Sequence, residues 1–191
     1  MEQNKEMTAQ QSLQIISETF NKSRKDILCN SAKYFMLWGA LLTATSLTIY
    51  ILWHLTGKPQ WNFLWFAMPA IGYPLAAVMG KYNKALPQNE VSKMLSGVWG
   101  VFGAFAITLS AIAVFLVPMH VTLLIVILMG LAECMSGVHL KNWPIIIGGF
   151  LLGVGGAVFA MLVTDEAQLL IFTLGGVLLL VTGLIIKLQY K

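Results

Sequence analysis

Six long runs of apolar residues dominate the hydrophobicity pattern of the chain. A helix needs about 20 apolar residues to cross the roughly 30 Å hydrocarbon core of a bilayer, and each run has about that length. The runs are continuous, whereas the strands of a membrane β-barrel alternate apolar and polar residues. The pattern therefore predicts an all-α polytopic membrane protein, a bundle of six transmembrane helices within residues 34–191. The expected spans are 34–55, 61–79, 98–117, 121–140, 145–163 and 169–186.

The first 33 residues have a different pattern. Leu13, Ile16, Phe20 and Ile27 recur at helical spacing opposite a charged face, which predicts an amphipathic helix. We expect residues 1–33 to form a cytoplasmic N-terminal region of their own. Its helix either lies on the inner leaflet, as interfacial helices do, or packs against protein, and a disordered segment is the third interpretation.

Composition and charge agree with a membrane protein and orient it. Of the 191 residues, 58% are hydrophobic and 10% are charged, whereas a soluble domain carries about 25% charged residues. With six spans, both ends of the chain and the second and fourth loops share one side of the membrane. That side carries every lysine and arginine except Lys58. Because basic loops stay in the cytoplasm, we expect both termini to be cytoplasmic.

Glu133 is the only Asp, Glu, Lys or Arg within the six runs. It lies about 18 Å along its helix from the outer end, in the inner half of the bilayer. A carboxyl group there is costly, and such residues face the bundle interior. The side chains three and four positions away are mostly small, so this face is expected to turn inward: Met129, Gly130, Ser136 and Gly137.

Three interpretations of Glu133 are open. A neutral glutamic acid can donate one hydrogen bond between helices, with polar side chains of other spans as partners; the candidates are Thr43, Thr45, Ser46 and Tyr73. Alternatively, Glu133 is a proton or cation site in a translocation path. In the third interpretation its carboxylate reaches the inner headgroups past Ser136.

Glycines concentrate in the last two runs. Gly149 and Gly153 have the GxxxG spacing, and Gly176 and Gly183 lie two turns apart on one face. Such faces let two helices approach closely. We expect the fifth and sixth spans to form a tight hairpin through these residues; homodimerisation through the same surface is the alternative.

No motif for catalysis, nucleotide binding or metal binding occurs in the chain. Walker A, GxGxxG, HExxH and GxSxG patterns are absent, and no span contains the paired Asp of an intramembrane protease. The net charge of +4 follows from the topology, so nucleic acid is not an expected partner. We expect no enzyme activity, cofactor, metal or catalytic residue.

Several short segments resemble those of small bacterial multi-span inner-membrane proteins of unassigned function. They are residues 12–16 (SLQII), 34–39 (YFMLWG), 136–137 (SG), Lys141 and 144–149 (PIIIGG). The resemblance implies a bacterial inner membrane and no particular activity. Two functions are therefore open. The first is a non-enzymatic membrane component that binds lipid, a membrane-protein partner or a second copy, and the alternative is a small proton- or cation-coupled transporter or channel using Glu133.

Overall fold

The computed structural model describes residues 9–82, 90–117 and 119–189. This part of the chain consists of helices joined by short turns and contains no strand. Six helical segments are long and apolar enough to cross a membrane, which confirms the predicted all-α polytopic fold. The elements are α1 (Ala9–Thr56), η1 (Pro59–Phe66), α2 (Ala67–Tyr82), α3 (Glu90–Phe115), α4 (Val121–Leu140), α5 (Trp143–Phe150), η2 (Leu151–Gly155), α6 (Gly156–Leu162) and α7 (Leu169–Gln189).

The membrane-spanning segments agree with the apolar runs, but two of them combine different kinds of helix. The second segment begins with the 3₁₀-helix η1 and continues as α2. The fifth consists of α5, the π-helical turn η2 and α6, which together cover Trp143–Leu162. Apolar length therefore located these spans, although it carried no information about the type of helix.

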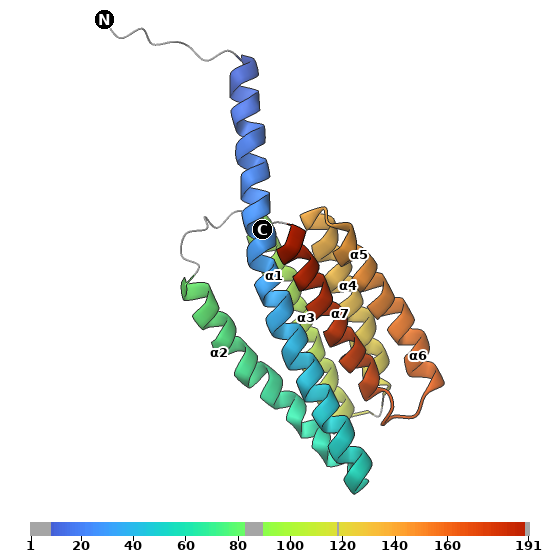
Figure 1. Cartoon of the computed structure of the whole chain (residues 1–191). Coiled ribbons are helices and arrows are strands. Elements are labelled where there is room, and N and C mark those ends of the chain that lie inside the picture. The colour runs from blue at the N-terminus through green and yellow to red at the C-terminus, as the bar shows by residue number, and fades with distance from the viewer. Residues whose placement is uncertain (1–8, 83–89, 118, 190–191) are drawn as a thin grey trace, which may run out of the picture.

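The N-terminal region and the first span form one helix. α1 continues without a break through residue 33, where a boundary was expected, and its first turns project beyond the bundle (Figure 1). Leu13 is exposed and Ile27 is buried, whereas the side chains of Ile16 and Phe20 lie outside the described part of the chain. The projecting turns and the first membrane-spanning segment therefore belong to one continuous helix, and the position of the N-terminal region on the inner leaflet stays a prediction.

α7 and α4 are at the centre of the bundle. α7 packs along α1, and α4 packs between α3 on one side and α5, η2 and α6 on the other. The peripheral helices contribute less to the interior: residues 93–115 of α3 include no buried side chain. Most of the apolar surface of α3 is therefore left for lipid.

Candidate functional site

The turn between α4 and α5 places these two helices side by side. Lys141 takes the left-handed conformation (φ 48°) and ends α4, with its backbone N–H donating to carbonyls of the last turn. The Asn142 side chain then accepts a hydrogen bond from the backbone N–H of Ile145 and caps α5. Pro144 follows in the first turn of α5, where a proline removes no helical hydrogen bond. The predicted turn between the fourth and fifth runs is thus confirmed.

Glycines bring the backbones of α4 and α5 into contact. A Cβ atom added to Gly130 would collide with the Cα of Gly153, which lies in η2 directly after α5. One added to Gly149 on α5 would lie 2.6 Å from the backbone nitrogen of Cys134. A Cβ atom added to Gly137 would likewise meet the side chain and the backbone nitrogen of Ile146. The candidate glycines Gly130 and Gly137 therefore face α5, and they fix the spacing at which Glu133 meets its neighbours.

Glu133 points from α4 into the junction with α5 and α7 and is fully buried. The position that a Cβ atom of Gly148 would take lies 2.9 Å from the Glu133 Oε1 atom and 3.4 Å from the Thr182 Oγ1 atom. Gly148 on α5 thus leaves room for the carboxyl group, and the Thr182 hydroxyl of α7 borders the same small space. Neither carboxyl oxygen has a hydrogen-bond partner among the described residues.

The surroundings of Glu133 offer it no opposite charge. The other titratable side chains of the described α4, α5 and α7 are Cys134, His139 and Lys187, and none of them forms a bond with Glu133. Within the described residues, no three His, Cys, Asp or Glu side chains come together as a metal site would require. The junction can therefore hold a proton on the carboxyl group, but it does not supply the ligand set of a metal ion.

Ser136 is buried on α4 but contacts a different neighbour. Its hydroxyl donates to the Ala132 carbonyl at 2.7 Å and accepts from the Trp99 indole N–H of α3 at 3.1 Å. Cys134 lies on the α5 side, where its thiol donates to the Ile146 carbonyl at 3.4 Å. Ser136 thus links α3 to α4, and Glu133 lies between the two flanking contacts.

The hydrogen-bond partners proposed for Glu133 from sequence are placed elsewhere. Thr43 and Ser46 of α1 contact α7: a Cβ added to Gly176 would meet the Thr43 hydroxyl, and the Ser46 hydroxyl lies 2.9 Å from that of Thr173. Tyr73 packs edge-on against Trp38. Sequence reasoning missed Gly148 and Thr182, although Thr182 is one of only two threonines in the last apolar run.

The predicted hairpin through the glycines of the last two spans is wrong. Gly149 and Gly153 contact α4, whereas Gly176 and Gly183 contact α1. In both interfaces a glycine faces small residues or backbone on the partner helix; Gly39 of α1, for example, lies against the Gly176 carbonyl. These surfaces are therefore covered within one chain, which leaves them unavailable for the homodimer considered above.

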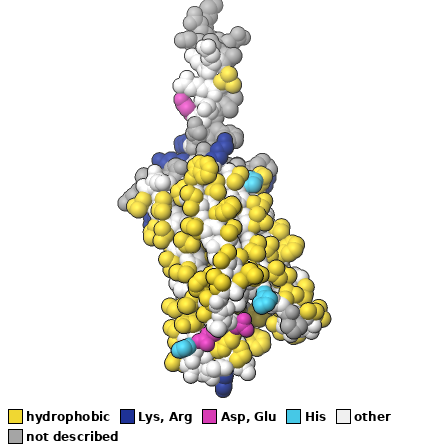
Figure 2. Space-filling model, turned by 90° about the vertical axis from the view of Figure 1, so that its right-hand side faces the viewer, with side chains coloured by type: hydrophobic (Ala, Val, Ile, Leu, Met, Phe, Trp, Pro, Cys, Tyr) yellow, Lys and Arg dark blue, Asp and Glu magenta, His cyan; other side chains and the backbone are white. Residues whose placement is uncertain are grey.

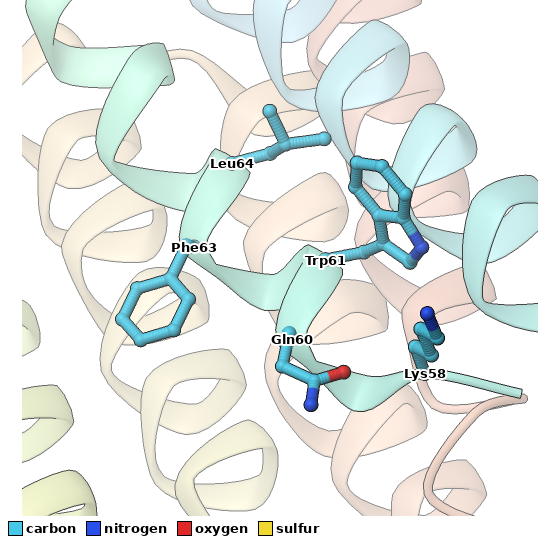
Figure 3. A pocket seen from close by; sticks show the side chains of 5 residues that line it. All are labelled: Lys58, Gln60, Trp61, Phe63 and Leu64. Atoms are coloured by element: carbon cyan, nitrogen blue, oxygen red, sulfur yellow. The ribbon is translucent and has the colours of Figure 1, made fainter.

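Two further features lie near the turns at the other end of the bundle. The His54 Nδ1 atom at the end of α1 lies 2.6 Å from Glu166 Oε1 in the turn before α7. Along η1, an open groove of about 460 Å³ is lined by Lys58, Gln60, Trp61, Phe63 and Leu64. Figure 3 shows Lys58 and Trp61 on one side of the ribbon and Phe63 on the other. Aromatic and basic side chains of this kind are typical of a membrane–water interface.

Comparisons of the chain with known protein families, with curated proteins and with solved structures found no match.

Proposed function

We propose that the chain is a non-enzymatic component of the bacterial inner membrane that binds a protein partner through the exposed N-terminal part of α1. The observation that carries this proposal is the projection of that part beyond the bundle (Figure 1). No described side chain from residue 10 to residue 25 is buried, and Leu13 has 66% of its surface exposed. A helix of this length is marginally stable alone in water, so a second surface would stabilise it.

The geometry favours protein over lipid as that second surface. α1 is straight across the junction and runs away from the bundle (Figure 1), whereas a lipid-bound amphipathic helix lies in the plane of the interface. A partner helix could cover the apolar positions and leave the polar ones in water. The pair formed by Gln14 and Glu18, whose side chains are 3.0 Å apart, would then remain solvated.

The charge distribution supports a cytoplasmic location for this contact. Figure 2 shows a broad apolar band, with lysine side chains gathered where the projecting helix meets the bundle. Acidic and histidine side chains are visible near the opposite end, together with one basic group. Because basic residues are retained in the cytoplasm, we infer that both termini lie on that side.

Site-specific crosslinking tests the partner contact. A photoreactive amino acid is introduced at Leu13, or at Lys22 on the opposite face of the helix as a control, and membranes of the native host are irradiated. We expect a protein adduct from position 13 that is weaker from position 22. The adduct should be lost from a photoprobe at Ser17, one helical turn from position 13 on the same face, when the chain also carries Leu13→Glu. Adducts with lipid alone, or equal protein adducts from both faces, would overturn the proposal.

A second candidate function is a small proton- or cation-coupled transporter or channel. The observation that favours it is the burial of both Glu133 carboxyl oxygens without a hydrogen-bond partner in the described part of the chain, because intramembrane carboxyl groups commonly mark proton or ion pathways. The test is flux into liposomes containing the purified chain, with Glu133→Gln for comparison. A pH-dependent flux that disappears in the variant supports transport; absence of flux in both proteins removes this candidate.

A further inference from the structure

We infer that the junction of Glu133, Gly148 and Thr182 is an occluded binding site for a single proton, and that losing this proton opens the contact of α4 with α5 and α7. The inference rests on the role of Glu133 as a proton site in the second candidate function. It goes further by naming the ligand and the structural change, and it requires no transport across the membrane.

The first step is the state of the carboxyl group in the closed junction. Glu133 is fully buried, and its two oxygens have no hydrogen-bond partner in the described chain. An ionised carboxylate without a partner or counter-ion costs several kcal/mol in such surroundings. The closed packing is therefore compatible with the neutral acid and incompatible with the anion.

The second step excludes a metal cation as the ligand. The side chains that border the space are one carboxyl group and one hydroxyl group, from Glu133 and Thr182. Hard metal cations take about six oxygen ligands, and no cluster of three metal-ligating side chains occurs among the described residues. A proton needs only the carboxyl group.

The third step concerns the groups that face Glu133. On α4 the adjacent titratable side chain is Cys134; α5 contributes none; and on α7 the nearest is Lys187, five residues beyond Thr182. Across the other face of α4, Ser136 contacts Trp99 of α3, and neither residue carries a charge. A negative charge created at Glu133 would thus have to be solvated by water, which requires the helices to separate.

The direction of the pH dependence follows from proton linkage. The closed junction holds one proton more than the open junction with an ionised carboxylate. The state that binds more protons gains stability as pH falls. The closed contact is therefore favoured in acid and weakened as pH rises.

Cys134 offers a reporter for this opening, because its thiol lies at the α4–α5 contact and donates to Ile146. The experiment uses the full chain in liposomes with Cys29→Ser, and measures the rate at which a thiol reagent labels Cys134 across a range of pH. The matched control adds Glu133→Gln, which keeps the shape of the side chain and cannot ionise. Dividing the rate of the chain with Glu133 by the rate of the Glu133→Gln chain at each pH removes the part of the thiol's pH dependence that both chains share. Repulsion between an ionised Glu133 and the Cys134 thiolate slows labelling of the chain with Glu133, so this repulsion alone cannot raise the ratio.

We expect a rate ratio near one in acid that rises about tenfold or more in alkali, as a minor open state becomes populated. A ratio independent of pH would overturn the inference.

Infrared spectroscopy of the unmodified chain gives a second test that needs no variant. A protonated carboxyl band that persists at neutral pH and exchanges slowly in D₂O supports the occluded proton, and its absence contradicts it. Neither the labelling ratio nor the infrared band measures flux. Both therefore test the occluded proton even if the liposome assay shows that the chain transports nothing.

Discussion

Gly130 shows how little room a single residue has in this bundle. An added methyl group would collide with two backbone atoms of Gly153, and backbone cannot move aside as a flexible side chain can. Because helices in lipid associate largely through close packing, small residues at this contact determine the distance between α4 and α5.

We expect Gly130→Ala to lower the free energy of unfolding by about 1–3 kcal/mol, the usual effect of overpacking. The matched control is Gly100→Ala, because a Cβ added at Gly100 would meet no atom of another described helix within 4 Å. Unfolding in mixed detergent micelles, followed by tryptophan fluorescence, measures both variants. Equal stability of the two would contradict the close contact.

The Trp99–Ser136 hydrogen bond is a polar link between the peripheral helix α3 and α4. Hydrogen bonds between membrane helices contribute about 0.6 kcal/mol on average. A double-mutant cycle with Trp99→Phe and Ser136→Ala should therefore give a favourable coupling of about 0.5–1 kcal/mol. A coupling of zero would show that Trp99 contributes through packing alone.

At the scale of elements, α1 is the largest departure from the sequence prediction. Local hydrophobicity located the first apolar run, but the change from a polar to an apolar pattern near residue 33 also suggested a boundary. Helical hydrogen bonds join backbone groups four residues apart and do not depend on whether the side chains are polar or apolar. α1 therefore continues through the polar-to-apolar change near residue 33.

Spin labels on the Leu13→Cys and Ala40→Cys double variant test the straight helix, with Cys29 and Cys134 replaced by serine. At 1.5 Å per residue, 27 residues of continuous helix separate the two backbones by about 40 Å. A bend to the membrane plane near residue 30 would shorten this distance to about 30 Å. Pulsed electron spin resonance in nanodiscs distinguishes these values, and the shorter one would restore the interfacial arrangement.

The choice of helix partners could not be predicted from the glycine spacing. Gly149 and Gly153 indicate a close approach, but the pattern does not say which helix approaches; Gly130 on α4 supplies the matching surface. Likewise, Glu133 was identified as an inward-facing residue from its own helix, whereas Gly148 and Thr182 meet it through tertiary packing. The spans and the inward face follow from local sequence, and the identity of the contacts requires the fold.

At the scale of the whole molecule, the charges at the two ends predict the orientation. In a chain with Cys29→Ser and Cys134→Ser, we expect a membrane-impermeant maleimide to label the Lys58→Cys variant in intact cells. The Lys141→Cys variant should react only after the membrane is permeabilised, because basic loops face the cytoplasm. The opposite pattern would reverse the topology.

The exposed contact between α1 and the turn before α7 contributes little to stability. The His54 and Glu166 side chains are 66% and 31% exposed, and solvent weakens pairs of this kind. A double-mutant cycle with His54→Gln and Glu166→Gln should give a coupling below about 1 kcal/mol. A larger value in a detergent unfolding assay would show that this pair holds the ends of α1 and α7 together.

The pairing of α1 with α7 has a consequence for biosynthesis. Ser46 and Thr173 meet although 127 positions separate them, so a ribosome must deliver nearly all of the apolar segments before α1 finds its main neighbour. Until then the face of α1 that carries Gly39 and Ser46 lacks its partner α7. A nascent chain stalled before α7 would therefore present an incomplete bundle to membrane proteases. Insertion of α7 is the step that completes assembly.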